Sequence, residues 1–370
     1  MNRTIILLLT LLSVLSANCK KPDGKIKAAY DERIELMSIL CRLAGFGEYN
    51  MNAGGKYIAE IDSFFSEVKN HPAVVMMDSL RQTNGIAFDA PMTFAVNLKK
   101  TEEGYGLACD TIVSEKRWEG VDLRIVTQKI SDFYNESGFK EFFKSHEPFY
   151  QEMCDMFNSN VTSRFNQDWY EQFYGVPPTE NFEVVIGFVN GGANYGPSRQ
   201  LPGEPRDVYA IMGFYIGKDG VPYFVSDPVS CLNTLVHEFN HSFVNHLTKD
   251  ERFAERIQKA GKGMMTFSAQ TMRRQAYGSW DELVNESIVR AAVIRYMIDN
   301  GLPEDEIRQS VVDEMASGFY WMPELVVCMA EYTDNRKSYT SIDKFYLKIA
   351  DFFDSYAKSS SDAVDAVFRK

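Results

Sequence analysis

The sequence predicts an α+β fold that is mostly helical, with a small mixed sheet in the middle of the chain. Apolar residues recur at helical spacing before residue 176 and after Pro228, whereas residues 182–225 contain short apolar runs separated by Gly and Pro. With 370 residues, of which 45% are hydrophobic, the chain is long enough to bury a large core. The formal net charge of −12 repels phosphate backbones, so we expect no nucleic-acid partner.

The first part of the chain is predicted to form helices with a mixed stretch between them. Asp31 can cap a helix whose apolar residues recur at threes and fours, and the same spacing returns over residues 58–68. Residues 93–98 and 123–127 are rich in apolar and β-branched residues, which is typical of strands. Residues 128–172 return to an aromatic-rich helical pattern.

The sequence pattern predicts the sheet in the middle of the chain and helices in its last part. Three short runs have strand composition: residues 184–189, 208–214 and 221–225. From Pro228 the pattern is helical almost to the end, and residues 341–356 form the clearest amphipathic stretch. We therefore divide the mature chain into a helical and mixed lobe, residues 29–176, and a second region, residues 177–370.

The first residues are expected to be an export signal and not part of the fold. Arg3 precedes an apolar run over residues 5–15, which is typical of a secretory signal peptide, here residues 1–18. The residues leading up to Cys19 resemble the lipobox of bacterial lipoproteins. This resemblance implies that Cys19 is lipidated and that residues 19–28 are a tether, whereas an ordinary signal peptide cleaved nearby is the alternative. We expect an exported protein of the bacterial cell envelope, anchored by its lipid to the outer membrane.

The strongest chemical signal is the sequence His237-Glu238-Phe239-Asn240-His241. Asp227-Pro228 is typical of a helix start, and residues four apart on a helix present their side chains to the same side. His237 and His241 can therefore bind one metal ion, for which we predict zinc. Glu238 lies about 100° round the helix and can act as a base toward a water molecule at that ion without binding the ion itself.

A third metal ligand has to come from elsewhere, and the helix expected after Ser279 offers two carboxylates. Ser279 and Glu282 have the spacing of a capping box, which gives Glu282 a local structural role. Glu286 lies one turn further on among apolar residues, so we predict Glu286 as the ligand. Glu282 is the alternative ligand, or the hydrogen-bond partner of a ligand histidine. His246 is not expected to bind, because it lies on the opposite side of the helix from His237.

The two motifs resemble those of the gluzincin zinc peptidases, in which HExxH is followed by a downstream glutamate. Glu286 stands 45 positions after His241, further than in familiar members, which implies an insertion such as residues 250–276. Segments around Asp31, Gly191 and Glu286 also resemble an uncharacterised bacterial family of exported HExxH proteins, classed as a domain of unknown function. The resemblance implies a zincin-like fold for the second region and a zinc peptidase without a known substrate.

A glycine-containing segment precedes the metal motif by 45 residues. Gluzincins pair an extended substrate with an edge strand above the metal, and glycine permits the close approach of another backbone. By this analogy the predicted substrate-binding residues are Gly192, Ala193, Asn194 and Tyr195. A glycine-rich turn between two strands is the alternative. The segment lacks the acidic motif with which aminopeptidases bind a substrate amino terminus, which favours an endopeptidase.

Together these residues predict a zinc-dependent peptidase in which Glu238 is the general base and the partner is a peptide or protein. Several side chains could stabilise the oxyanion: Tyr195, Tyr277, Arg290, Tyr296 and Tyr320. Two other interpretations stay open, namely a zinc-binding protein without catalytic activity and a lipoprotein that binds a ligand in the cell envelope.

Overall fold

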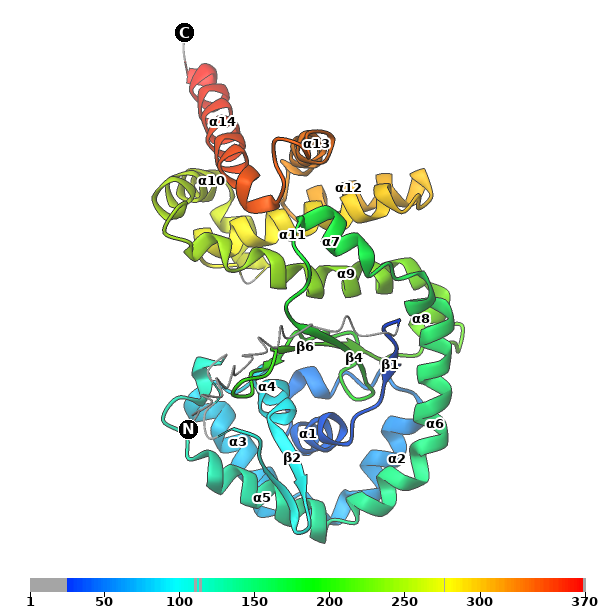
Figure 1. Cartoon of the computed structure of the whole chain (residues 1–370). Coiled ribbons are helices and arrows are strands. Elements are labelled where there is room, and N and C mark those ends of the chain that lie inside the picture. Colours follow the sequence, from blue (N-terminus) through cyan, green and yellow to red (C-terminus); the bar gives the residue numbers. More distant parts are fainter. Residues whose placement is uncertain (1–24, 110–111, 113–114, 276, 369–370) are drawn as a thin grey trace, which may run out of the picture.

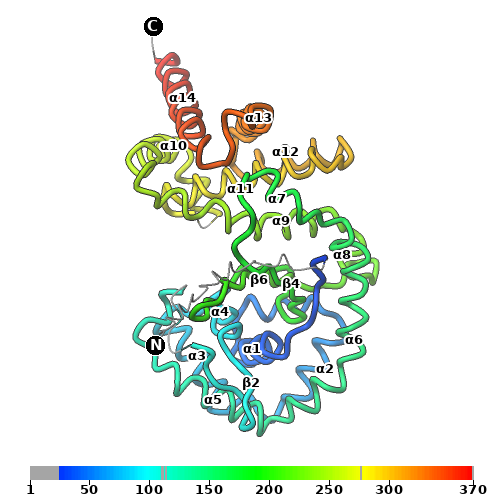
Figure 2. Tube along the Cα trace, viewed as in Figure 1, coloured from blue at the N-terminus to red at the C-terminus, as the bar shows by residue number. Residues whose placement is uncertain are grey.

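The structure, a computed structural model, describes residues 25–109, 112, 115–275 and 277–368. A four-stranded sheet lies between two groups of helices (Figure 1). Helices α1 (Glu32–Leu43) and α4 (Ala90–Val96) lie on one side of the sheet, and α9 (Pro228–Val244) lies on the other. Figure 2 shows the same layers along the Cα trace, with the C-terminal helix projecting away from the sheet. The prediction of a mostly helical α+β protein with a small mixed sheet is confirmed.

The first group of helices packs around α1. As predicted, α1 begins after Asp31, whose carboxylate accepts a hydrogen bond from the Arg33 amide. The other helices of this group are α2 (Lys56–Phe64), α3 (Pro72–Asn84), α5 (Leu123–Glu136) and α6 (Phe139–Asn160). A separate antiparallel hairpin, β2 (Leu98–Thr101) and β3 (Gly104–Leu107), packs against α5.

The main sheet has the strand order β1-β4-β6-β5. Its members are β1 (Ala28–Ala29), β4 (Asn181–Gly187), β6 (Asp207–Gly213) and β5 (Ser198–Arg199). The two long strands are parallel and correspond to the predicted strands 184–189 and 208–214. β5 runs antiparallel to β6 at the sheet edge, and Tyr195 forms a further bridge with Ile211. The chain from Tyr195 to Arg199 is therefore an edge strand beside β6, which packs against α9.

The second group of helices begins with α9. Its start is as predicted, because the Asp227 carboxylate accepts from the Ser230 amide and Pro228 is the first helical residue. The apolar face of α9 packs on aromatic rings: Phe239 stacks on Phe182 of β4, with ring centroids 4.3 Å apart. The remaining helices are α7 (Asp168–Tyr174), α8 (Tyr223–Ser226), α10 (Ala254–Arg274), α11 (Trp280–Asp299), α12 (Glu304–Ala316), α13 (Met322–Asp334) and α14 (Ile342–Phe368). α10 lies within the insertion expected at residues 250–276 and packs against α11 and α14.

Three of the predicted strands are wrong, because short apolar runs form helices as readily as strands. Residues 93–98 fall mostly in α4, which starts next to Pro91 and is buried all round, and a short buried helix has the same apolar composition as a buried strand. Residues 123–127 begin α5, where the Asp122 carboxylate accepts from the Arg124 and Ile125 amides. Residues 221–225 lead into the short helix α8.

The predicted signal peptide, residues 1–18, and the lipidation site Cys19 lie outside the described residues. Of the predicted tether, 19–28, the described part ends in the sheet, because Ala28 belongs to β1. The five cysteines within the described part of the chain are free thiols. Among the helices described, none combines the length and the apolar character needed to cross a membrane.

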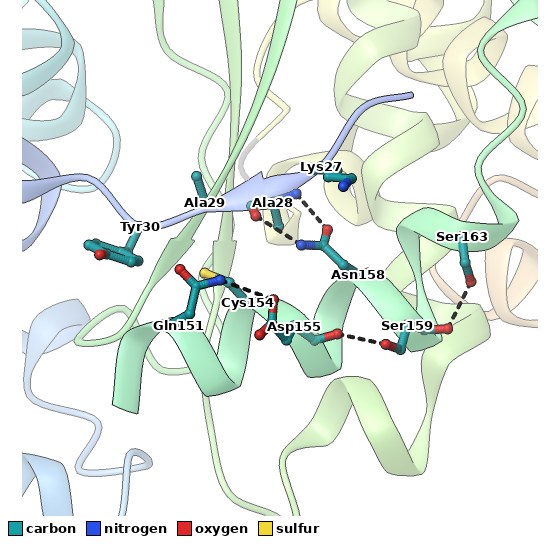
Figure 3. Close-up of a pocket in the computed structure, with 10 residues that line it drawn as sticks. All are labelled: Lys27, Ala28, Ala29, Tyr30, Gln151, Cys154, Asp155, Asn158, Ser159 and Ser163. Carbon is teal, nitrogen blue, oxygen red and sulfur yellow. Dashed lines mark hydrogen bonds between the residues drawn. The ribbon is translucent and has the colours of Figure 1, made fainter. Parts of the chain in front are cut away.

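β1 is held on its open side by a side chain of α6. Asn158 accepts from the Ala28 amide at 2.7 Å and donates to the Ala28 carbonyl at 3.1 Å, as a neighbouring strand would (Figure 3). A cavity of about 710 Å³ lies beside this contact. Its lining residues include none of the predicted metal or substrate residues.

The core of the first group of helices contains a buried acid. Glu35 of α1 accepts a hydrogen bond of 2.5 Å from the Tyr57 hydroxyl, which lies 2.7 Å from the Tyr150 hydroxyl. Burial raises the pKa of Glu35 to about 7, although the bond from Tyr57 opposes that shift. The folded protein therefore holds this proton at pH values where an unfolded chain has released it.

Replacing this acid with an amide, Glu35→Gln, should change how stability depends on pH. Between the ordinary value of 4.5 and about 7, the folded wild type binds more protons than the unfolded chain, so its free energy of unfolding falls as the pH rises. The slope is at most about 1.4 kcal/mol per pH unit. Urea unfolding at about pH 5 and about pH 8 should show the variant gaining stability relative to wild type at the higher pH. An identical difference at both pH values would contradict this assignment.

Candidate metal centre

α9 and α11 bring three metal-binding side chains together. His237 and His241 lie one turn apart on α9, and their Nε2 atoms are 3.1 Å apart. Glu286 of α11 faces both rings, with its Oε2 3.6 Å from His237 Nε2 and its Oε1 3.5 Å from His241 Nε2. These three residues form a group that could hold a metal ion.

The spacing of these atoms fits a tetrahedral ion. Ligand atoms about 2.0–2.1 Å from a zinc ion lie about 3.3–3.4 Å from one another in an ideal tetrahedron. The distance of 3.1 Å between the two Nε2 atoms is close to that value. The shortest distances from the carboxylate, 3.6 Å from Oε2 to His237 and 3.5 Å from Oε1 to His241, are also close to it, and one ligand atom from each residue can be chosen with all three within 4.8 Å of one another. Burial, together with the charges of His241 and Arg290, lowers the pKa of His237 well below its ordinary value. The His237 ring is therefore neutral at physiological pH, as a metal ligand must be.

Asn245 orients the second histidine. It lies one turn after His241 at the end of α9, and its Oδ1 is 3.0 Å from His241 Nδ1. A hydrogen bond donated by Nδ1 leaves Nε2 without a proton and facing the metal position. Sequence reasoning missed Asn245, although its spacing of four residues from His241 was available as a signal.

Glu286 is held in place by Tyr277 and Arg290. The Tyr277 hydroxyl donates to Glu286 Oε2 at 3.1 Å, and Arg290 Nε lies 3.3 Å from the same oxygen. Arg290 in turn donates to the Tyr277 oxygen at 3.0 Å and forms a 2.8 Å ion pair with Glu314 of α12. Burial raises the pKa of Tyr277 to about 12, so this hydroxyl keeps its proton and remains a donor.

The five side chains considered for stabilising the oxyanion have different surroundings in the structure. Tyr277 and Arg290 reach the ligand carboxylate. Tyr296 is engaged elsewhere, because its hydroxyl accepts from the Asn166 amide at 2.7 Å. Tyr320 is 52% exposed, and Tyr195 is buried with its ring packed against Tyr49.

Glu238, the residue after His237, lies against the edge strand. A Cβ atom placed on Gly196 would be only 2.6 Å from Glu238 Oε2, so the carboxylate packs directly on the backbone of Gly196. Burial raises the pKa of Glu238, His241 opposes that shift, and the charges of Glu286 and Asp89 add to it. The carboxylate is therefore a stronger base than an exposed one.

The predicted substrate segment divides into a turn and the start of the edge strand. Gly192 and Ala193 lie in the turn after β4, and the Asn194 side chain accepts a 2.8 Å bond from the Gly213 amide. Tyr195 is the member of the set that enters the edge strand. Gly196 was not predicted, because nothing in the sequence distinguishes it from the other glycines of this segment.

The remaining predicted residues have other roles. Glu282 completes the predicted capping box, with its Oε2 accepting from the Gly278 and Ser279 amides at 2.7 and 2.9 Å. His246 is exposed beyond the end of α9 and is not in the metal-binding group. Both arrangements agree with the choice of Glu286 as the third member of the group.

Fold and site define an α+β protein in which two helices bring together three residues that could hold a metal ion. Residues 26–351 match the family described as "Domain of unknown function (DUF4932)", and the chain belongs to that family. No curated protein and no solved structure matches the chain. The family description names no activity, so the chemistry has to be argued from the site.

Metal titration of variants tests the centre. His237→Ala and Glu286→Ala each remove one of three protein ligands and should abolish stoichiometric binding of a divalent ion. Asn245→Ala should weaken binding by about 10–100-fold, since only the support of His241 is lost. Competition with a chromophoric chelator measures these affinities. His246→Ala is the matched control and should bind as wild type does; if it lost as much affinity as His237→Ala, the centre would be wrongly placed.

Proposed function

We propose that the protein is a zinc-dependent peptidase of the gluzincin type, with a zincin-like arrangement of an edge strand and two ligand helices. The observation that carries this proposal is the triangle formed by His237, His241 and Glu286, with the Glu238 carboxylate beside it. Two imidazole nitrogens and one carboxylate are a ligand set of catalytic zinc sites, in which the fourth position is open. A structural zinc site would instead use four protein ligands.

The residues around the triangle have the roles that hydrolysis needs. When bound, zinc would supply Lewis-acid activation of a water molecule and of a peptide carbonyl group. Glu238 takes the proton from the attacking water and delivers it to the leaving nitrogen. Its raised pKa suits it to both transfers. Tyr277 and Arg290 keep Glu286 facing the two histidines.

The edge strand supports a peptide as the substrate. Tyr195 exchanges backbone hydrogen bonds of 3.0 and 2.8 Å with Ile211, and the Pro197 carbonyl accepts from Tyr209 at 2.9 Å. Successive residues of a strand direct their backbone groups to opposite sides, so the N–H and C=O of Gly196 point away from β6. An extended peptide that pairs there would place its own backbone next to Glu238.

The sequence also supports a location for this activity. We propose that the protein is exported and anchored to the cell envelope through a lipid on Cys19, with the peptidase facing peptides or proteins at the membrane surface. Labelling of the protein with a radioactive fatty acid, and loss of the label in Cys19→Ser, tests this proposal. A labelled Cys19→Ser protein would contradict it.

The variant Glu238→Gln tests the chemistry. An amide cannot accept the proton of the attacking water, so hydrolysis of a peptide mixture should fall by about 10²–10⁴-fold or more. Zinc content should stay stoichiometric, because Glu238 is outside the ligand group. Mass spectrometry of the products and metal analysis of the same sample measure both quantities. Undiminished cleavage by the variant would refute the role of Glu238.

Gly196→Ala tests the contact between the edge strand and the base. The added methyl group would displace the Glu238 carboxylate, which is the end of a flexible side chain, so the fold and the bound zinc should be retained while hydrolysis falls. Gly47→Ala is the control, because an added Cβ there would meet nothing within 4 Å and its φ is not positive. The two variants should unfold at the same temperature, and only Gly196→Ala should cleave peptides more slowly than wild type. Equal activity of both would show that Gly196 does not limit the position of Glu238.

A further inference from the structure

Phe88 combines an exposed ring with an unfavourable backbone conformation. Its side chain is 58% exposed and its φ is 56°, in the left-handed region that bulky residues rarely adopt. Among the described residues, Asn52 is the other non-glycine residue with a positive φ. A large apolar residue held in this conformation on the surface indicates a function, because it benefits neither the core nor the local backbone.

Buried groups hold Phe88 in place from two sides. The Glu48 carboxylate accepts from the Phe88 amide at 2.8 Å, and the Tyr49 hydroxyl donates to the Phe88 carbonyl at 2.8 Å. On the other side Arg117 donates to the carbonyl of Ala87 at 2.8 Å and to the carboxylate of the residue after Phe88. The ring is therefore presented to solvent by a rigid segment.

This segment lies beside the edge strand and the proposed base. Tyr49, which bonds to Phe88, also packs its ring against Tyr195, with centroids 6.0 Å apart, and Tyr195 is the neighbour of Gly196. Asp89 follows Phe88, and its charge acts on Glu238. α4, which begins directly after Asp89, packs against β5. Phe88 is thus linked to the edge strand through Tyr49 on one side and through Asp89 and α4 on the other.

A second exposed apolar side chain lies in the first lobe two residues after Tyr49, the residue that bonds to Phe88. Met51 is 47% exposed, and a Cβ on Gly191 would lie 2.8 Å from its sulfur atom, so Met51 covers the turn that leads into the edge strand. The next residue, Asn52, has a φ of 54° and accepts a 2.7 Å bond from Arg42. Met51, next to one positive-φ residue, therefore contacts Gly191, and Phe88, the other, is linked to Tyr195 through Tyr49.

We propose that Phe88 and Met51 form a binding surface for a large apolar side chain of a peptide substrate. This inference rests on the proposed function and names the class of substrate: peptides with an aromatic or long aliphatic residue near the bond that is cleaved. A peptide paired with the edge strand directs alternate side chains away from the sheet plane, and in this proposal one of them contacts the Phe88 ring and the Met51 side chain. An aromatic ring offers such residues a large apolar contact area, and the flexible methionine side chain adapts to their shape.

The variant Phe88→Asn tests this surface. Asn tolerates the left-handed conformation and keeps both backbone hydrogen bonds, so the fold should be unchanged while the apolar ring is lost. Phe368→Asn is the matched control, because Phe368 is 79% exposed at the far end of α14. The substrates are two hexapeptides that differ only by Phe or Ser at one central position.

Wild type and Phe368→Asn should cleave the Phe peptide with a kcat/KM at least about tenfold above that for the Ser peptide, and Phe88→Asn should lose this preference through KM. Binding of the fluorescein-labelled peptides to zinc-loaded Glu238→Gln, with and without Phe88→Asn, provides a measurement that needs no turnover. Cleavage with an unchanged preference in Phe88→Asn would overturn the inference and leave the proposed function intact. Binding that depends on Phe88 without any cleavage would overturn the proposed function and leave the surface intact. If the protein cleaves neither peptide and Phe88→Asn does not change peptide binding, both the proposed function and the proposed binding surface are wrong.

Discussion

The close approach of α9 and α11 is the constraint on which the site depends. One ion can be shared only if the ring nitrogens of α9 and the carboxylate of α11 stay at ligand distances. Asn240, buried inside the HExxH motif, donates to the Val289 carbonyl of α11 at 3.3 Å and accepts from the Tyr174 hydroxyl of α7 at 3.0 Å. Since a buried amide is costly unless it is paired, these two bonds fix the relative position of three helices at the level of the site.

The charges around the site favour a bound cation. Glu238, Glu286 and Glu314 are gathered near Arg290, whose guanidinium contacts two of them. Buried carboxylates need partners, and one guanidinium does not balance three of them. A divalent cation between Glu286 and the two histidines would supply the missing positive charge. Burial of these acids is then compatible with a stable fold.

The grouping of His237, His241 and Glu286 was more predictable than the surroundings of these residues. The pair His237 and His241 depends on residue spacing along α9, and the capping box of Ser279 and Glu282 depends on spacing at the start of α11. Such spacing can be read directly from the sequence. The strands expected at residues 93–98 and 123–127 are helices, because short apolar runs have the same composition in both states. Gly196 and Phe88 gain their importance from packing between segments far apart in the chain, which no local pattern reports. The edge strand itself was expected a few residues too early, in the turn that precedes Tyr195.

X-ray absorption spectroscopy of the zinc-loaded protein tests the shared ion most directly. The fine structure should show two imidazole rings and oxygen ligands at about 2.0–2.1 Å, consistent with His237, His241, Glu286 and a solvent molecule. Sulfur at about 2.3 Å, or scattering from a single imidazole, would place the ion elsewhere in the molecule and remove the basis for a hydrolytic centre between α9 and α11.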